Sequence, residues 1–125
     1  GVIPSSHTAM YNVALKLKEA VRPDEVILTV GVDWDSTIPY FSQRYAIMLP
    51  SWHLNDYTPV REGEYFSPLA VLENIELYLA GRNLGAIVIC TTRSAKDDVI
   101  ASNYILDRWD LEWQSDGECS YGIVP

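Results

Sequence analysis

The sequence is poor in basic residues, and this scarcity excludes several kinds of partner. Lysine and arginine together number 9 against 17 acidic residues, which gives a formal net charge of -8. Proteins that bind nucleic acids or anionic membrane surfaces neutralise phosphate groups with an excess of Lys and Arg. We therefore expect no nucleic-acid partner.

Long hydrophobic runs are missing too. A transmembrane helix needs about 18 or more consecutive apolar residues, and no such stretch occurs here. The chain also opens without the pattern of a signal peptide. A piece excised from a longer protein would have lost such segments, so their absence does not indicate a cytoplasmic origin.

Residues that commonly hold metals are scarce. The only cysteines are Cys90 and Cys119, and His7 and His53 have no partner at a ligand spacing, so we expect no metal site. Cys90 ends an apolar run, which favours a small buried hydrophobic residue. A disulfide with Cys119 is the alternative, and it would require an oxidising compartment. No GxGxxG, Walker, HExxH or GxSxG motif occurs, and we expect no cofactor.

What the sequence does contain is an alternation of apolar runs and helical periodicity, with 48% hydrophobic residues. Continuous β-branched and apolar runs predict buried strands at 26–30, 45–49 and 86–90. Apolar residues at helical spacing predict helices at about 7–21, 40–44, 68–81 and 94–109. For the last helix we expect an apolar face of Val99, Ile100, Ile105 or Leu106, and Trp109. The segments 111–114 and 119–124 flank a turn at 115–118 and predict a hairpin.

These elements predict a single α/β domain over residues 1–125. The expected architecture is a three-layer sandwich whose mostly parallel sheet has the strand order 2-1-3 and is closed by the antiparallel hairpin. In such sheets ligands bind beyond the carboxyl ends of the strands. The loops after the first and third strands would then lie side by side and bring Asp33, Trp34 and Asp35 close to Thr92 and Arg93. These five residues are candidate ligand contacts.

One enzymatic interpretation of the acidic turn is a phosphatase. The segment 33–37 reads DWDST and matches the DxDxT pattern of haloacid dehalogenase-like phosphohydrolases, in which Asp33 would be the nucleophile and Asp35 the general acid/base beside Mg²⁺. The later motifs of that family would all fall within residues 91–98, on one loop and helix start. Adjacent carboxylates on a helix point apart and cannot supply the metal ligands together. This spacing argues against the phosphatase, which stays an alternative.

A second pattern covers more of the chain. The segment 31–50, GVDWDSTIPYFSQRYAIMLP, resembles the extracytoplasmic C-terminal domain of bacterial GT-C type membrane glycosyltransferases, relatives of dolichyl-phosphate-mannose protein mannosyltransferases. The residues that carry the resemblance are Gly31, Asp33, Trp34, Pro39, Tyr40, Arg44 and Pro50. Two positions depart from the pattern, because Phe41 stands where a second tyrosine is common and Gln43 precedes Arg44.

The resemblance implies a small α/β domain excised from a longer membrane protein, on the extracytoplasmic (periplasmic) face of the cell membrane. Its partners would be its own transmembrane domain and a saccharide or polypeptide acceptor, and the donor would be a polyprenyl-phosphate sugar. The catalytic acid of such enzymes lies in the membrane part, so no catalytic residue is carried over. The domain would position the acceptor or cover the active site.

The same residues allow a direct physical interpretation. Trp34 and Tyr40 have flat rings of the kind that stack on sugars, and Asp33, Asp35 and Arg44 supply hydrogen-bonding groups. These add Tyr40 and Arg44 to the candidate ligand contacts. The architectural alternative is that Trp34 plugs the top of the sheet, Tyr40 packs under the helix and Arg44 forms an ion pair with Asp33 or Asp35. A stand-alone module that binds a neutral or cationic small molecule is a further alternative.

Overall fold

The sheet of the protein is mixed, with parallel strands in one half and an antiparallel hairpin at the opposite edge. The computed structural model describes residues 6–32, 35–49, 68–90 and 96–125, and within them the strand order is β2-β1-β3-β5-β4. The strands are β1 (Val26–Val30), β2 (Tyr45–Leu49), β3 (Leu84–Cys90), β4 (Gln114–Asp116) and β5 (Cys119–Ile123). β1 pairs in parallel with β2 and β3, whereas β5 runs antiparallel to β3 and β4. The predicted 2-1-3 order and the closing hairpin are confirmed.

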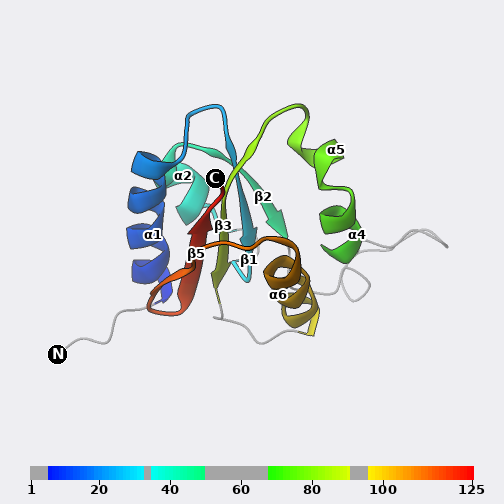
Figure 1. Cartoon of the computed structure of the whole chain (residues 1–125). Helices are drawn as coiled ribbons and strands as arrows, with labels where there is room; N and C mark the ends of the chain where they lie inside the picture. The colour runs from blue at the N-terminus through cyan, green and yellow to red at the C-terminus, as the bar shows by residue number, and fades with distance from the viewer. Residues whose placement is uncertain (1–5, 33–34, 50–67, 91–95) are drawn as a thin grey trace, which may run out of the picture.

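Helices cover both faces of the sheet (Figure 1). One layer consists of α1 (Ser6–Ala20) and α2 (Thr37–Ser42), and the other of α4 (Pro68–Glu73), α5 (Ile75–Leu79) and α6 (Lys96–Arg108). β1 lies between β2 and β3 and is buried along its whole length, as its apolar run predicts. The three-layer α/β sandwich is therefore confirmed.

Two apolar cores lie on the two sides of β1. Ile27 faces the α1 side, where Val13 and Leu17 are fully buried, and Leu28 faces the other layer together with Leu72. Burying a side chain of this size stabilises the folded state by about 1.5–3 kcal/mol. Alternation along one strand thus divides its apolar residues between two helical layers.

The predicted helix at 68–81 is two short helices in the structure. Asn74 separates α4 from α5 with φ -117° and ψ 32°. Its side-chain amide donates a hydrogen bond of 2.9 Å to the carbonyl oxygen of Ala70, and asparagine often interrupts a helix by bonding nearby backbone in this way. Leu72, Ile75 and Leu79 are nevertheless buried as predicted.

The predicted apolar face of the helix at 94–109 is right at Ile105 and at Trp109, which packs partly buried against the same core, but wrong at Val99 and Ile100. Val99, Ile100 and Leu106 are 52%, 42% and 52% exposed, whereas Ala101 and Ile105 are buried. α6 carries apolar residues on its exposed side as well as on its buried side, so apolar spacing alone did not select the buried face.

Two further boundaries differ from the prediction. α2 begins at Thr37 rather than near Tyr40 and ends before Gln43, which has a left-handed φ of 57°. The hairpin turn consists of Gly117 and Glu118 alone, so β4 is formed by 114–116 rather than by 111–114. Leu111, in the segment predicted as a strand, instead packs against the core on the α6 side.

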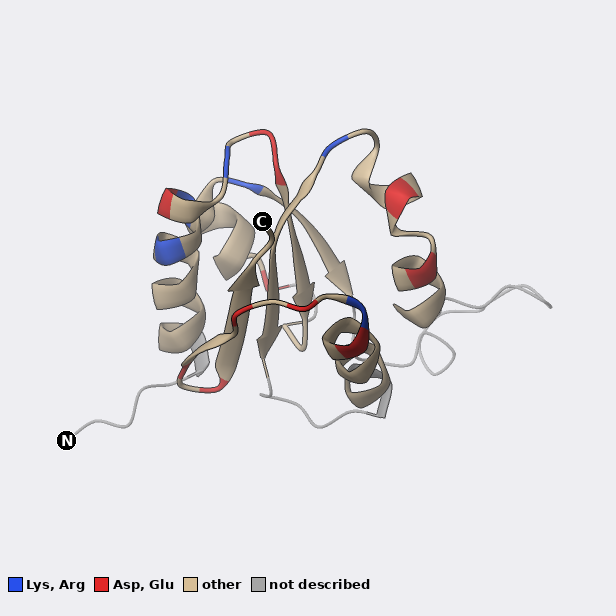
Figure 2. Ribbon diagram, viewed as in Figure 1, with Lys and Arg blue, Asp and Glu red and all other residues tan. Residues whose placement is uncertain are grey.

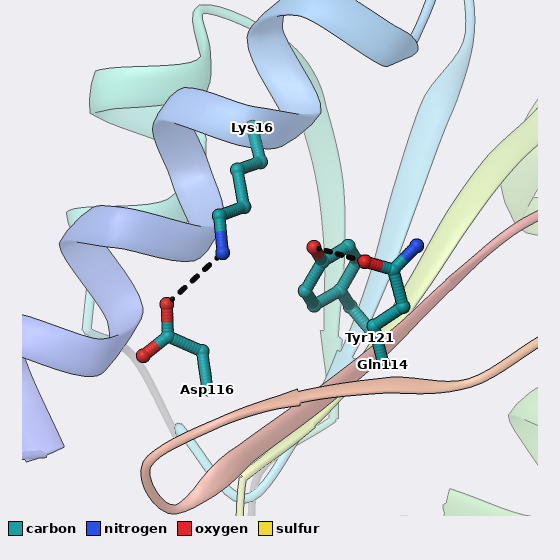
Figure 3. Close-up of polar contacts among 4 residues, drawn as sticks. All are labelled: Lys16, Gln114, Asp116 and Tyr121. Atoms are coloured by element: carbon teal, nitrogen blue, oxygen red, sulfur yellow. Dashed lines mark hydrogen bonds and ion pairs between the residues drawn. The ribbon is translucent and has the colours of Figure 1, made fainter.

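Charged residues lie on the helices, the connecting segments and the end of β4, while β1, β2, β3 and β5 contain none (Figure 2). One ion pair joins α1 to the hairpin: Lys16 Nζ lies 3.3 Å from an Asp116 carboxylate oxygen (Figure 3). Beside it, the Tyr121 hydroxyl donates a 3.0 Å hydrogen bond to Gln114. The hydrogen bond with Asp116 raises the pKa of Lys16, and the nearby Tyr121 adds to the effect. These contacts connect the first helix to the last strands of the chain.

Candidate functional site

The candidate ligand contacts divide into two groups. Asp33, Trp34, Thr92 and Arg93 lie outside the described residues. Asp35, Tyr40 and Arg44 are described. The geometry of the site is therefore built from these three residues and from the strand ends that precede the two loops.

The carboxyl ends of the neighbouring strands β1 and β3 lie side by side. Val30 pairs with Ile89, and the next residue, Gly31, lies against the backbone of Cys90. The two loops that carry the acidic turn and Thr92 with Arg93 therefore leave the sheet from neighbouring positions. This confirms the premise of the predicted site, the adjacency of the two strands, while the loops' own side chains stay outside the described residues.

Asp35 organises the start of α2. Its Oδ1 accepts a 2.9 Å hydrogen bond from the backbone N–H of Thr37 and a 2.6 Å hydrogen bond from the Thr37 hydroxyl. Its own backbone N–H donates to the carbonyl oxygen of Val32, at 3.0 Å. Asp side chains commonly bond the backbone two residues on in such turns. Asp35 thus anchors the first residue of α2 to the segment before it.

Arg44 caps the end of α1. Its Nε and Nη2 donate to the carbonyl oxygen of Val21 at 3.0 and 2.9 Å, and Nη2 also donates to that of Lys18 at 2.9 Å. Its Nη1 donates to the carbonyl oxygens of Ser42 and Gln43 at 3.2 and 3.0 Å. The last carbonyl groups of a helix have no partner within the helix, so a guanidinium here supplies the missing donors.

Arg44 and Asp35 lie near opposite ends of β1. Arg44 directly precedes Tyr45, which pairs with Val26 at the start of β1, whereas Asp35 follows the end of β1. The five residues of β1 separate its two ends by roughly 16 Å, at about 3.3 Å per residue. The predicted ion pair between Arg44 and Asp35 is therefore wrong, although the architectural role of Arg44 is supported by its hydrogen bonds.

Tyr40 belongs to an exposed aromatic cluster, which we define as Tyr11, Tyr40 and Phe41. The rings of Tyr40 and Phe41 meet edge to face with centroids 4.9 Å apart, and those of Phe41 and Tyr11 meet in the same way at 4.8 Å. The side chains are 39%, 72% and 37% exposed in sequence order. The prediction that Tyr40 packs under the helix is wrong, because most of its side chain faces solvent.

Sequence reasoning missed Tyr11 in this cluster. Tyr11 lies on α1, 29 positions before Tyr40 in the chain, and the packing of α2 against α1 brings the two segments together. The sequence did contain one usable signal. Tyr11 lies beside the apolar stripe of α1, and Leu15, which is four residues later and therefore on the same side of the helix, is also exposed (41%). Tyr11 extends the exposed apolar surface from α2 onto α1.

The two cysteines form a disulfide. Cys90 ends β3 and Cys119 begins β5, and the antiparallel register places them opposite each other with Cα atoms 4.0 Å apart. Both residues are buried as predicted for Cys90, but the interpretation of Cys90 as an unbonded hydrophobic residue is wrong. The bond ties the strand that precedes Thr92 and Arg93 to the C-terminal hairpin.

Within the described residues, no group of three or more His, Cys, Asp and Glu side chains is arranged to hold a metal ion. None of the helices in this described part is both long and apolar enough to cross a bilayer. Comparison with known proteins finds no matching family model, no matching curated protein and no matching solved structure.

Proposed function

We propose that the chain is a non-catalytic extracytoplasmic domain of a membrane glycosyltransferase that uses a lipid-linked sugar donor. The proposal starts from the resemblance of segment 31–50 to the C-terminal domain of GT-C type enzymes. The α/β sandwich is the kind of fold that this resemblance implies. The observation that carries the proposal further is the disulfide between Cys90 and Cys119.

The disulfide supports an extracytoplasmic location. Disulfides persist in oxidising compartments such as the bacterial periplasm and are rare in the cytosol, where thiols are kept reduced. Cys90 is 2% exposed and Cys119 is fully buried, so the bond belongs to the packed interior rather than to an accessible redox site. A buried structural disulfide fits a domain that folds after export.

The aromatic cluster supports contact with a sugar or an acceptor. Tyr40 and Phe41 follow the turn that Asp35 holds in place, so their backbone is fixed by the start of α2. Exposed aromatic rings offer apolar faces for stacking together with hydroxyl groups for hydrogen bonding. In the full-length protein this cluster would position the acceptor or cover the active site, and the transmembrane part would supply the catalytic acid.

The first experiment tests location and thiol state in the native cell. The full-length protein is expressed with a reporter fused after this domain that is active only outside the cytoplasm, and the cells are lysed directly into urea with a maleimide, which labels free thiols even where folding buries them. We expect reporter activity, upstream hydrophobic helices in the gene, and Cys90 and Cys119 protected from labelling until a reductant is added. A gene without such helices, or labelled cysteines in untreated cells, would contradict the proposal.

The second experiment tests the aromatic cluster. Sugar transfer from a polyprenyl-phosphate donor is measured in membranes that contain full-length protein with Tyr40→Ala. We expect lower transfer than for the wild type, with Tyr78→Ala as the matched control, since Tyr78 is also exposed (52%) but lies on α5 in the opposite layer. Mg²⁺-dependent phosphate-ester hydrolysis by the purified chain, lost on Asp33→Asn, would instead establish the phosphatase alternative.

A further inference from the structure

β2 is the outermost strand on one side of the sheet (Figure 1). It pairs with β1, and no other strand of the described part of the chain pairs with it. In a parallel pair, alternate residues direct their N–H and C=O groups toward the neighbouring strand, and the residues between them direct theirs away. The outer side of β2 therefore presents a row of backbone donors and acceptors roughly 16 Å long, at about 3.3 Å per residue.

The sequence of β2 contains none of the usual guards of a sheet edge. Native proteins discourage further pairing at an edge with charged residues, prolines, bulges or very short strands. β2 has five residues, YAIML, without a charge or a proline. It pairs with β1 residue for residue, from Tyr45 with Val26 to Leu49 with Val30, so no bulge interrupts it. This edge has the regular geometry that a further strand requires.

The opposite edge of the same sheet is guarded. β4 has only three residues, and it ends in Asp116, whose carboxylate lies 3.3 Å from Lys16 Nζ. The side chain of Gln114 accepts a 3.0 Å hydrogen bond from the Tyr121 hydroxyl. A short strand with a charged end is a common protection against edge pairing. The two edges of one sheet thus differ, and β2 is the one suited to an added strand.

The side chains of β2 also leave apolar surface uncovered. β1 is buried along its whole length, whereas Tyr45 is 62% exposed and the next three residues, 46–48, are half-buried. Ile47 packs only partly buried against the core on the α6 side. A strand added beside β2 would cover part of this apolar surface, which favours association in addition to the backbone hydrogen bonds.

The row of backbone groups determines the kind of partner. Donors and acceptors at the spacing of a strand are matched by another extended polypeptide. Because β2 contains no charged residue, a neutral segment can pair with it without leaving a charge unpaired. A second copy of this chain is disfavoured, since each copy has a net charge of -8 and the two would repel each other.

We infer that β2 binds a neutral, extended segment of another polypeptide, which adds to the sheet beside it. Main-chain hydrogen bonds would supply the affinity, and alternate side chains of the added segment would contact the apolar residues of β2. This binding mode goes beyond the proposed function, because the partner is defined by the open strand and not by the resemblance of segment 31–50.

The test is amide hydrogen exchange of the ¹⁵N-labelled chain, followed by NMR, without and with the neutral peptide acetyl-STVTVTS-amide. Thr and Val favour an extended backbone. In the free chain we expect alternate amides of β2 to exchange at least tenfold faster than those between them, and the peptide should slow the fast ones several-fold. The amides of β4, the other edge, should not respond to the peptide.

The matched control is the same peptide with N-methyl groups on its Thr and Val amides. It keeps every side chain but has lost the hydrogen-bond donors of those residues, so it should bind at least tenfold more weakly.

Three outcomes would overturn the inference. Slow exchange at every β2 amide of the free chain would show that this edge is already paired, within the chain or with a second copy, and sedimentation equilibrium would tell which. No slowing at about 1 mM peptide, enough to detect a millimolar Kd, would show that the edge takes no added strand. Equal binding of the N-methylated peptide would show that side chains alone make the contact. Any of these would remove the strand site while leaving the proposed function to its own tests of location and thiol state.

Discussion

Gly31 lies so close to Cys90 that no other residue fits at position 31. A Cβ atom there would come within 1.8 Å of the Cys90 carbonyl oxygen and 2.9 Å of its carbonyl carbon. Gly31 also has a φ of 85°, a conformation that side-chain-bearing residues rarely adopt. The contact fixes the point at which the chain leaves β1 and enters the acidic turn, next to the disulfide-bonded end of β3.

Gly31→Ala is expected to destabilise the fold by more than about 3 kcal/mol, because both backbone strain and a collision with backbone atoms oppose it. Gly81→Ala is the matched control: Gly81 has a φ of 84°, but its added Cβ would meet nothing within 4 Å. It should cost only the strain, about 1–2 kcal/mol. Urea denaturation of both variants measures the difference, and equal losses would show that the close approach to Cys90 does not matter.

Loss of the disulfide is expected to cost about 3–4 kcal/mol. The bond joins residues 29 positions apart, and a cross-link closing a loop of that length restricts the unfolded chain by roughly this amount. The double variant Cys90→Ala/Cys119→Ala and the wild type in reductant should unfold at similar urea concentrations, both well below that of the oxidised wild type. A wild-type midpoint that reductant does not move would refute the bond's contribution.

Arg44→Ala is expected to destabilise the protein by about 2–3 kcal/mol, because backbone carbonyl groups at the end of α1 lose their charged donor. Arg44→Lys should recover less than half of this, since one ammonium cannot reach the oxygens that the planar guanidinium bridges. Arg22→Ala is the control for charge, since Arg22 is exposed just after Val21, and it should change stability by less than about 0.5 kcal/mol. Equal effects of the Arg22 and Arg44 variants would refute the capping role.

Thr29→Val is expected to stabilise the fold by about 1 kcal/mol. Thr29 is fully buried in β1, and its hydroxyl has no hydrogen-bond partner among the residues that the structure describes, so replacing it with a methyl group removes an unpaired polar atom at constant volume. Thr37→Val makes the same chemical change at a buried hydroxyl that donates to Asp35, and it should destabilise by about 1–2 kcal/mol. Thermal or urea unfolding of the two variants should give shifts of opposite sign.

The ion pair of Lys16 and Asp116 is expected to lose its effect in alkaline solution. Its hydrogen bond with Asp116 raises the pKa of Lys16 above the ordinary 10.5. The folded state therefore binds this proton more tightly than the unfolded state, and the contribution is present below pH 10.5 and fades as pH rises through the folded-state value. The melting temperatures of the wild type and Lys16→Met should differ at neutral pH and converge once the pH exceeds the folded-state pKa of Lys16. Lys18→Met should show no such convergence.

The sequence predicts the arrangement of the sheet well because burial of strands leaves a direct signal. The apolar runs at 26–30 and 86–90 are of the kind that is buried on both faces of a sheet. The preference for right-handed crossovers between parallel strands then limited the order in which these strands could be arranged. The face of α6 was harder, since Val99 and Leu106 are as apolar as Ile105 and the choice among them depends on the neighbouring layer.

The contacts within the candidate site were less accessible to sequence reasoning. Arg44 bonds carbonyl oxygens, which every residue carries, so no partner residue type could reveal its role. The pairing of Cys90 with Cys119 depends on the register of β3 with β5, which the spacing of the two residues does not encode. Asp35 was singled out because polar residues that follow a buried strand are a local signal of a ligand site, whereas its hydrogen bonds with Thr37 were not predicted.

The Cys90–Cys119 bond also closes a covalent ring of chain that contains all of α6 and β4. A protease that cuts one peptide bond within this ring produces two fragments that stay attached to each other. The nicked domain would retain α6 on the sheet at an effective concentration that no separate fragment could reach. A single cut in this quarter of the chain would therefore leave the domain in one piece.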